Sequence, residues 1–401
     1  MKLDRPDDGA AFHLAEVGVP ADPTAPWAPV WDGISESSLA HHLDLHGYDD
    51  MADDNTAASV LRYTQQDEQS KVWLVAVRGP RPDGTPDGSV AGVRLIASEP
   101  GPDGPSADDV LACAYASAPL LDNTHLLEVI LAQVRPAHRR QGIEAAMVDL
   151  FEELARRFDR TTLLAWVSHR GALADDATPS DQSIADPTGS IRIRRDHHDV
   201  ALLLSRGYGF AQAERHSLQP LPVPTEVLRA AADPTRATAA GYEVVQWTGL
   251  TPDEYLDDFA VLAGAMSTDP PLGDVDWRPE SYDAERVRRM ETRASIDITF
   301  ATTAVRHRAS GRVVGMTQVG VVQRKPEVAF QWSTIVLQDH RGHGLGMLLK
   351  AANARLLHEE FPDVRRVHTW NADENAYMLN VNIALGYRQE SIDGCWQRVV
   401  A

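Results

Sequence analysis

Residues 336–346 read Val-Leu-Gln-Asp-His-Arg-Gly-His-Gly-Leu-Gly and join an apolar segment, 328–337, to a segment with leucines at helical spacing. This pattern predicts a buried strand that turns directly into an amphipathic helix. Glycines at 342, 344 and 346 let the backbone turn tightly and approach a ligand without a Cβ clash. The first amides of a helix have no partner within the helix, and with the helix dipole they form an anion site. The stretch therefore predicts a site for phosphate groups.

The arrangement of residues in this turn limits which phosphate ligand it can serve. A nucleotide-binding P-loop needs Gly-Lys-Ser/Thr, which is absent here. A dinucleotide fingerprint needs a third glycine at the position that Met347 occupies. The arrangement that remains is Arg-x-x-Gly-x-Gly from Arg341, in which Arg341 and the two histidines add positive potential. Each charge-assisted hydrogen bond contributes roughly 1.5–3 kcal/mol, so a diphosphate is the natural occupant.

At this turn the sequence resembles the GCN5-related N-acetyltransferase (GNAT) family, whose members use such a loop for the pyrophosphate of acetyl-CoA. A second match follows at Asn375, Met378 and Leu385-Gly386-Tyr387, which is similar to the closing helix of the family. The strand and hairpin before the turn, residues 296–337, also follow the family order. The resemblance implies acetyl-CoA as cosubstrate, bound by Thr334, Ile335, Val336, Arg341, Gly342, His343, Gly344, Leu345, Gly346 and Asn375.

The resemblance further implies direct acetyl transfer to an amine bound beside acetyl-CoA, with a backbone amide near residues 334–336 stabilising the oxyanion. Glu327 is a candidate general base, with His340 as a weaker one; an exposed strand-edge carboxylate is an equally good reading of Glu327. Where members of the family often have a tyrosine that protonates the leaving thiolate, this chain has Asn382. Asparagine cannot supply a proton, so either the thiolate leaves unaided or Tyr377 acts as the acid, unless Tyr377 is only a surface or packing residue.

His340 and His343 lie three residues apart, which raises the alternative of a metal site. No third ligand is apparent and no HExxH motif is present, so we expect histidines near the phosphates and no metal.

A chain of 401 residues is long enough for two domains. Its two halves repeat one order of elements, which predicts an internal duplication. We expect an α/β (α+β) fold of two tandem GNAT-like domains, each with a mixed, mostly antiparallel sheet flanked by helices. The predicted ranges are 1–218, a proline-rich linker at 219–240, and 241–401. The Pro/Gly-rich region 78–108 reads as strands joined by long hairpin loops.

The first half departs from the family pattern at the corresponding turn, residues 139–144. Glu144 stands where the last small residue belongs, and its carboxylate would face the phosphates. Asp196 or His198 takes the place of the asparagine. We expect this half to bind acetyl-CoA weakly or not at all and to serve as scaffold or as part of the substrate cleft. The alternative is that Glu144 points to solvent and the site survives.

The amino-acid composition limits the kinds of partner that the chain can bind. With 38 basic and 58 acidic residues the net charge is −20, which argues against nucleic acid. The two cysteines, Cys113 and Cys395, form no CxxC motif, so a zinc ribbon or a disulfide scaffold is not expected. Neither a signal peptide nor a membrane-spanning run is evident in the sequence. These features predict a cytoplasmic protein with neither a nucleic-acid nor a membrane partner. The resemblance implies a small-molecule amine as the partner, and we expect a monomer or a homodimer.

The leading hypothesis is therefore an acyltransferase that moves an acetyl group from acetyl-CoA to a primary amine of a small molecule, with the active site in the second half. The alternatives are a non-catalytic sensor of acetyl-CoA and a protein lysine acetyltransferase, which would need an open cleft for a peptide.

Overall fold

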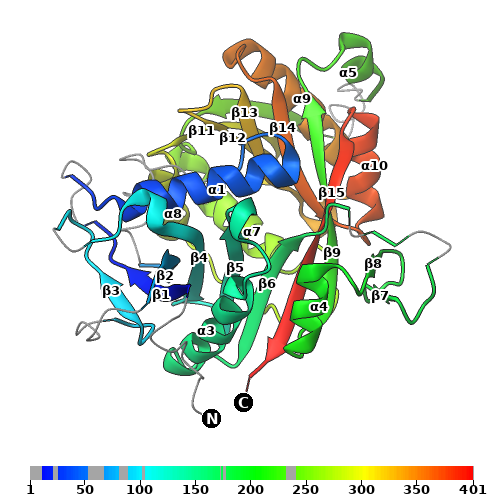
Figure 1. Ribbon diagram of the computed structural model, residues 1–401. Helices are drawn as coiled ribbons and strands as arrows, with labels where there is room; N and C mark the ends of the chain where they lie inside the picture. The colour runs from blue at the N-terminus through cyan, green and yellow to red at the C-terminus, as the bar shows by residue number, and fades with distance from the viewer. Residues whose placement is uncertain are drawn as a thin grey trace. The chain divides into compact units, whose positions relative to one another are not determined.

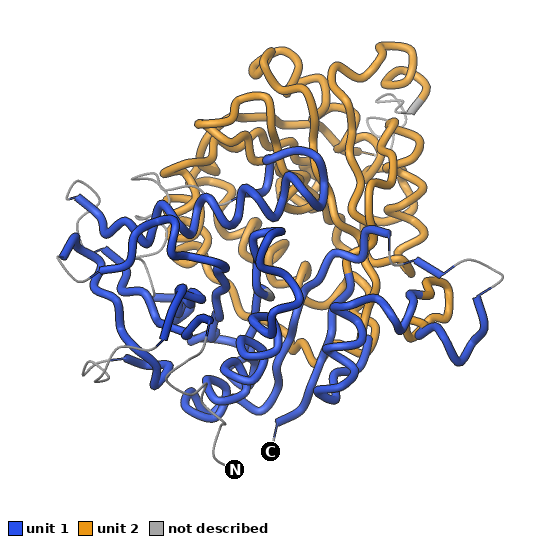
Figure 2. The backbone as a smooth tube through the Cα atoms, in the orientation of Figure 1, with its two compact units in different colours: residues 1–184, 193–210, 394–401 blue, residues 185–192, 211–393 orange. Residues whose placement is uncertain are grey.

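The computed structural model describes residues 11–20, 26–52, 67–80, 89–101, 104–171, 173–174, 178–231 and 241–400. The chain divides into two compact units, coloured in Figure 2. Unit 1 comprises residues 1–184, 193–210 and 394–401, and unit 2 comprises 185–192 and 211–393. Each unit therefore contains a segment from the opposite half of the sequence.

Unit 1 is built on a mixed sheet whose strands follow the order β3-β1-β2-β4-β5-β6. The pairs β1–β2, β2–β4 and β4–β5 are antiparallel, whereas β1–β3 and β5–β6 are parallel. The strands are β1 (Phe12–Val17), β2 (Gln69–Arg78), β3 (Arg94–Ile96), β4 (Val110–Pro119), β5 (Leu126–Val134) and β6 (Thr162–Ser168).

The helices of unit 1 are α1 (Val30–His46), α3 (Ile143–Arg157) and α4 (His198–Ser205), with short 3-10 turns η1 (Ala107–Asp109) and η2 (Pro136–His138). Helix α3 buries the apolar face that its sequence spacing predicts, including Met147, Phe151 and Leu154. The short strands β7 (Ser183–Ala185) and β8 (Arg192–Arg194) form a separate two-stranded sheet.

Unit 2 repeats this plan with strands in the order β10-β11-β12-β13-β14-β9 (Figure 1). The β13–β14 pair is parallel and the other neighbouring pairs are antiparallel. The strands are β9 (Gly209–Pro220), β10 (Tyr242–Thr248), β11 (Ile298–His307), β12 (Val313–Val322), β13 (Val328–Val336), β14 (Arg366–Ala372) and β15 (Arg388–Val399), the last of which ends within unit 1.

The helices of unit 2 contribute to two separate hydrophobic clusters. Leucines of α9 pack with strand residues such as Val319 and Val367, and α7 packs with Met316 and Ile335. The helices are α5 (Thr225–Ala231), α7 (Leu256–Met266), α8 (Ala284–Ala294), α9 (Leu345–Glu360) and α10 (Ala376–Ala384), with 3-10 turns η3 (Asp253–Tyr255) and η4 (Gln338–His340).

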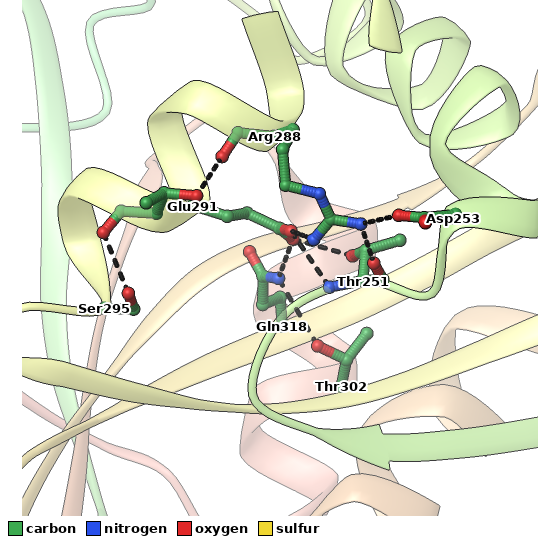
Figure 3. A network of polar contacts seen from close by, with 8 residues as sticks. Thr251, Asp253, Arg288, Glu291, Ser295, Thr302 and Gln318 are labelled. Carbon is green, nitrogen blue, oxygen red and sulfur yellow. Dashed lines mark hydrogen bonds and ion pairs between the residues drawn. The ribbon is translucent and has the colours of Figure 1, made fainter. Parts of the chain in front are cut away.

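The buried carboxylate of Glu291 connects α8 to the rest of unit 2 through hydrogen bonds (Figure 3). Glu291, 6% exposed, accepts hydrogen bonds from the amide of Thr251 at 2.9 Å, from the Thr251 hydroxyl at 2.6 Å and from Gln318 Nε2 at 3.2 Å. Arg288, one helical turn earlier, contacts the same carboxylate and also Asp253. The network ties the helix to β12 and to the loop that precedes η3.

The predicted fold class is confirmed: both units hold a mixed, mostly antiparallel sheet flanked by helices. One local prediction is wrong. The region 78–108 contains no hairpin among its described residues, because β3 pairs in parallel with β1 rather than with a sequence neighbour. The compact units also depart from the predicted ranges, since 211–218 belongs to unit 2 and 394–401 to unit 1. Of the predicted linker, 225–231 forms α5, and 232–240 lies outside the described residues.

Candidate active site

A cavity of about 570 Å³ opens in unit 2 where β13 ends and where α9 and α10 begin. Four chain segments line it, and all belong to unit 2. They are the end of α7 and the segment after it (Met266, Asp269, Pro270, Pro271), the end of β13 (Thr334, Ile335, Val336), the turn into α9 (Arg341, Gly342, Leu345, Gly346) and the start of α10 (Glu374, Asn375, Ala376, Tyr377, Met378).

The cavity exists because β13 and β14 diverge. Their parallel pairing extends only over residues 328–330 of β13, so the later part of the strand has no β14 partner. On the other side, β13 pairs with β12 through a bulge in which Trp332 is the extra residue. Residues 334–336 thus line the cavity along an edge that β14 does not cover. An extended ligand with amide groups can hydrogen-bond to the backbone there, apart from the Val336 carbonyl, which accepts from Arg341.

The turn into α9 has the backbone geometry of an anion site. Gly342 and Gly344 adopt φ angles of 83° and 72°, in the left-handed region that favours glycine. Gly344 caps α9, and none of the described protein groups accepts a hydrogen bond from the amides of residues 342–346. These amides, at the positive end of the helix dipole, fit a pyrophosphate.

Arg341 has protein partners in this structure. Its Nε donates to the carbonyl of Val336 at 2.9 Å, and its Nη2 forms an ion pair with Asp269. The side chain is 47% exposed and lines the cavity, so it remains within reach of an incoming anion. Asp269 therefore competes with a phosphate for this guanidinium.

The two histidines of the turn lie against β10 and β11 rather than in the cavity. His340 Nδ1 is 2.9 Å from the hydroxyl of Tyr242, and the His343 ring lies 5.5 Å from the Tyr242 ring. Burial, followed by the nearby imidazole of His307, lowers the pKa of His340. His340 is thus neutral near pH 7 and adds no positive charge to the turn.

Helix α10 begins at the wall of the cavity. The Asn375 side chain is its N-cap and accepts a hydrogen bond from the amide of Met378 at 3.2 Å. The hydroxyl of Tyr377 approaches the start of α9 so closely that a Cβ on Gly346 would lie 3.3 Å from it. Glycine at 346 therefore makes room for Tyr377 at the mouth of the anion site.

The structure brings together most, but not all, of the predicted site residues. Those that line the cavity are Thr334, Ile335, Val336, Arg341, Gly342, Leu345, Gly346, Asn375 and Tyr377. His343 and Gly344 belong to the same turn without lining the cavity. Glu327 precedes β13, at the end of the strand away from the turn. Asn382 is buried in α10 and donates to Asn371 Oδ1 at 2.6 Å.

Several lining residues belong to no recognisable sequence motif. Pro270 and Pro271 follow α7 without any motif, and Glu374 precedes the recognisable asparagine. They come from segments that only tertiary folding places beside the turn. The proline pair after a predicted helix was the one signal available, since proline ends helices.

In unit 1, the corresponding turn has the carboxylate of Glu144 at the position where the turn of unit 2 could hold an anion. Gly142 caps α3 with a φ of 87°, as Gly344 caps α9. Glu144 is only 9% exposed, and its Oε1 lies 3.4 Å from the amide of Arg140 and 3.8 Å from His198. The side chain thus turns back over the turn instead of pointing to solvent. At the start of α4 the cap residue is His197, between the two predicted positions Asp196 and His198.

Within the part of the chain that the structure describes, no group of three or more His, Cys, Asp or Glu side chains is arranged to hold a metal ion. None of the helices in this part of the chain has both the length and the apolar composition to span a bilayer.

Comparison with known proteins gives matches at the level of structure. No protein-family model matches the sequence, and no curated protein matches it significantly. A tandem GNAT protein from the clavulanic acid biosynthesis pathway, solved without acetyl-CoA, is similar over 97% of this chain and 98% of its own, with a TM-score of 0.64 and 23% identity.

Two other solved structures have the same architecture. A GCN5-related N-acetyltransferase from Sphaerobacter thermophilus aligns over 98% of this chain and 96% of its own, with a TM-score of 0.56 and 16% identity. A glucosamine N-acetyltransferase region of a fungal multi-domain β-N-acetylglucosaminidase aligns over 99% of this chain and 39% of that one, with a TM-score of 0.55 and 12% identity. The chain thus has the fold of the tandem GCN5-related N-acetyltransferases.

Proposed function

We propose that this protein is an N-acetyltransferase that binds acetyl-CoA in the cavity of unit 2 and transfers the acetyl group to a primary amine of a small molecule. The observation that carries the proposal is the glycine turn of residues 342–346, whose amides have no protein acceptor among the described residues and which borders the cavity. A doubly phosphorylated carrier matches that chemistry.

Each wall of the cavity has a role in this proposal. The amides of the turn hold the pyrophosphate, with Arg341 adding charge. The free edge of β13 at residues 334–336 binds the amide groups of the pantetheine arm and orients the thioester. Acetyl-CoA supplies an activated acyl group, and the chain supplies proximity and a backbone amide for the oxyanion. Tyr377, which lines the cavity, is the candidate donor of a hydrogen bond to the leaving sulfur in this proposal.

Unit 1 serves as scaffold in this proposal and binds no acetyl-CoA. Its turn has the same capping glycine, but the Glu144 carboxylate lies over the amides that a phosphate would need. Two negative groups cannot share that position without a large electrostatic cost. We therefore expect one acetyl-CoA site per chain.

Calorimetric titration of acetyl-CoA tests this proposal through a reciprocal pair of variants. Gly346→Glu gives unit 2 the carboxylate that Glu144 gives unit 1, and we expect it to abolish binding. Glu144→Gly is the matched change in unit 1, and the wild-type site should persist in it unaltered. Two sites in the wild type, or full binding by the Gly346→Glu variant, contradicts the assignment.

A second measurement separates the enzyme from a sensor. Release of the free thiol of CoA is followed across a panel of small amines, with a lysine peptide as a further acceptor. Thiol release with small amines supports the proposal. Binding of acetyl-CoA without thiol release on any acceptor indicates a sensor, and release only with the peptide indicates a protein lysine acetyltransferase.

A further inference from the structure

Strand β9 places a carboxylate, Glu214, beside the end of β14, the strand that leads into the wall of the cavity of unit 2. Ala372, the last residue of β14, pairs with Glu214, and the amide of Asp373 donates to the carbonyl of Ala213 at 2.9 Å. The lining of the cavity begins one residue later, at Glu374. Glu214 therefore stands one strand away from the cavity wall, although it precedes that wall by more than 150 residues in sequence.

An aromatic face leads from the fork between β13 and β14 to Glu214. His216 stacks on Trp370 with ring centres 4.4 Å apart and on His368 at 5.2 Å. Phe330, the last residue of β13 that pairs with β14, stacks on His368 at 5.0 Å. Side chains two apart on a strand share a face, so Glu214 lies on the face of His216. This face thus connects the point where the strands diverge with the carboxylate.

Glu214 differs from the two carboxylates near it in having no hydrogen-bond donor among the described residues. Asp393 accepts from Trp370 Nε1 at 2.7 Å, and Glu374 accepts from Gln212 Nε2 at 3.0 Å. Burial, and then the negative charges of Asp393 and Glu374, raise the pKa of Glu214 to about 7. Among the described residues, the imidazoles of His216 and His368 also lie on this face, and they contact each other at 2.9 Å. Glu214 is thus a half-buried carboxylate free to accept a proton near neutral pH.

We propose that Glu214 is the general base of the acetyl transfer and that it receives the cationic amine of the acceptor. This inference rests on the proposed function, because it assigns the base for that reaction. It also defines the acceptor as a primary amine that is an ammonium ion in solution. Glu327, the base predicted from the sequence, precedes β13 at the end of the strand away from the glycine turn.

The proposed acetyl transfer conserves atoms and charge. The Glu214 carboxylate takes one proton from the ammonium, and the neutral nitrogen forms a bond to the thioester carbonyl carbon. The carbon–sulfur bond then breaks, and its electron pair leaves with the thiolate of CoA. The second nitrogen proton passes to the sulfur, directly or through solvent, which gives the thiol of CoA, and Glu214 returns its proton to solvent. The products are the acetamide and CoA, with one net proton released.

The test compares Glu214→Gln with two other glutamate-to-glutamine variants. Glu359→Gln, on the exposed end of α9, is the matched control, and Glu327→Gln is the competing base. For each protein, kcat for thiol release is measured from pH 5.5 to 9 with a saturating small amine, and acetyl-CoA binding is measured separately by calorimetry. Thermal unfolding shows whether each variant is folded. Glu214→Asp, which keeps the carboxylate, is included as the conservative variant.

The expected result is specific to Glu214. In the wild type, kcat rises with pH through about 7 as this carboxylate loses its proton. Glu214→Gln lowers kcat about 10²–10⁴-fold and removes this rise, with acetyl-CoA binding unchanged. Glu214→Asp retains the pH-dependent rise at a reduced rate, and Glu359→Gln behaves as wild type.

Other results overturn the inference. It fails if Glu214→Gln and Glu214→Asp both keep the wild-type rate and pH profile, or if Glu327→Gln alone removes the rise. These outcomes differ from failure of the proposed function, in which the wild type neither binds acetyl-CoA nor releases thiol.

Discussion

The ammonium nitrogen of Lys350 lies 4.6 Å from the centre of the Tyr387 ring, inside the core that α9 forms with the sheet of unit 2. The lysine is 5% exposed. A cation over an aromatic face is attracted to the ring, but that attraction offsets only part of the cost of removing the ammonium from water. Burial accordingly lowers the pKa of Lys350 from 10.5 to about 7.

Lys350→Met is expected to stabilise the protein at pH 7. Because the folded-state pKa lies below the ordinary value, the unfolded chain binds an extra proton between pH 7 and 10.5, and stability rises with pH across that window. Methionine has similar length and no charge to bury, so we expect a gain of roughly 1–4 kcal/mol at pH 7. Chemical denaturation at pH 7, 8 and 9.5 measures both the gain and the slope. Lys325→Met, on the turn before β13, serves as the control for loss of one positive charge.

Gly344→Ala is expected to weaken acetyl-CoA binding beyond its effect on stability. The φ of 72° at Gly344 strains any residue with a Cβ, so relief of that strain moves the amides away from the phosphates. Gly311→Ala is a matched control, since Gly311 has a φ of 71° in the turn between β11 and β12. Both variants should lose about 1 kcal/mol or more of stability, but only Gly344→Ala should raise the Kd for acetyl-CoA. An equal loss of binding in both variants would mean that the turn acts only through stability.

Asp269→Asn is expected to tighten acetyl-CoA binding about 2–5-fold, the effect of an exposed ion pair. The substitution releases Arg341 from its ion pair and removes a negative charge from the cavity wall. Asp339→Asn changes the net charge equally, from an exposed position beside the turn that makes no ion pair with Arg341. Calorimetry at low and high salt should show tighter binding for Asp269→Asn alone, with the advantage shrinking as salt screens it. Weaker binding would indicate that Asp269 orients Arg341 toward the phosphates.

Glu291→Gln is expected to destabilise unit 2 by roughly 1–3 kcal/mol. Both carboxylate oxygens of Glu291 accept hydrogen bonds from Thr251 or Gln318, and an amide replaces one acceptor with a donor (Figure 3). Glu285→Gln, also on α8, removes a carboxylate that is 88% exposed and should change stability by less than about 0.5 kcal/mol. Denaturant titration followed by tryptophan fluorescence compares the two. Similar small losses would show that the network adds little to the attachment of α8.

The glycine turn of residues 342–346 is the part of the candidate site that the local sequence determines. A strand, a glycine turn and the first turn of a helix are contiguous, so 328–346 could be predicted nearly to the residue, as could the pairing of 298–307 with 313–322. The capping role of Asn375 is local as well. Such features depend on backbone conformations and on hydrogen bonds within a few residues.

The surroundings of Glu214 could not be predicted in this way, because non-local pairing forms them. A periodic pattern identifies a strand but not its neighbours, so it does not show that β3 pairs with β1 or that β9 completes unit 2. For the same reason Glu327, which is close to the turn in sequence, lies at the far end of its strand, whereas only strand pairing brings Glu214 beside the end of β14. Asn382 lies on α10, and its side chain donates a hydrogen bond to Asn371. The spacing of residues in the sequence does not reveal this contact.

The placement of β9 has a consequence for how such a protein can evolve. The strand that covers the β14 edge is encoded before the linker, so a gene for residues 241–401 alone would specify a sheet with an exposed, aggregation-prone margin and no Glu214. If the first half lost its phosphate site, the protein would still need that half, because the second half depends on strand β9, which the first half supplies. Selection would then retain both copies after only one of them kept a ligand.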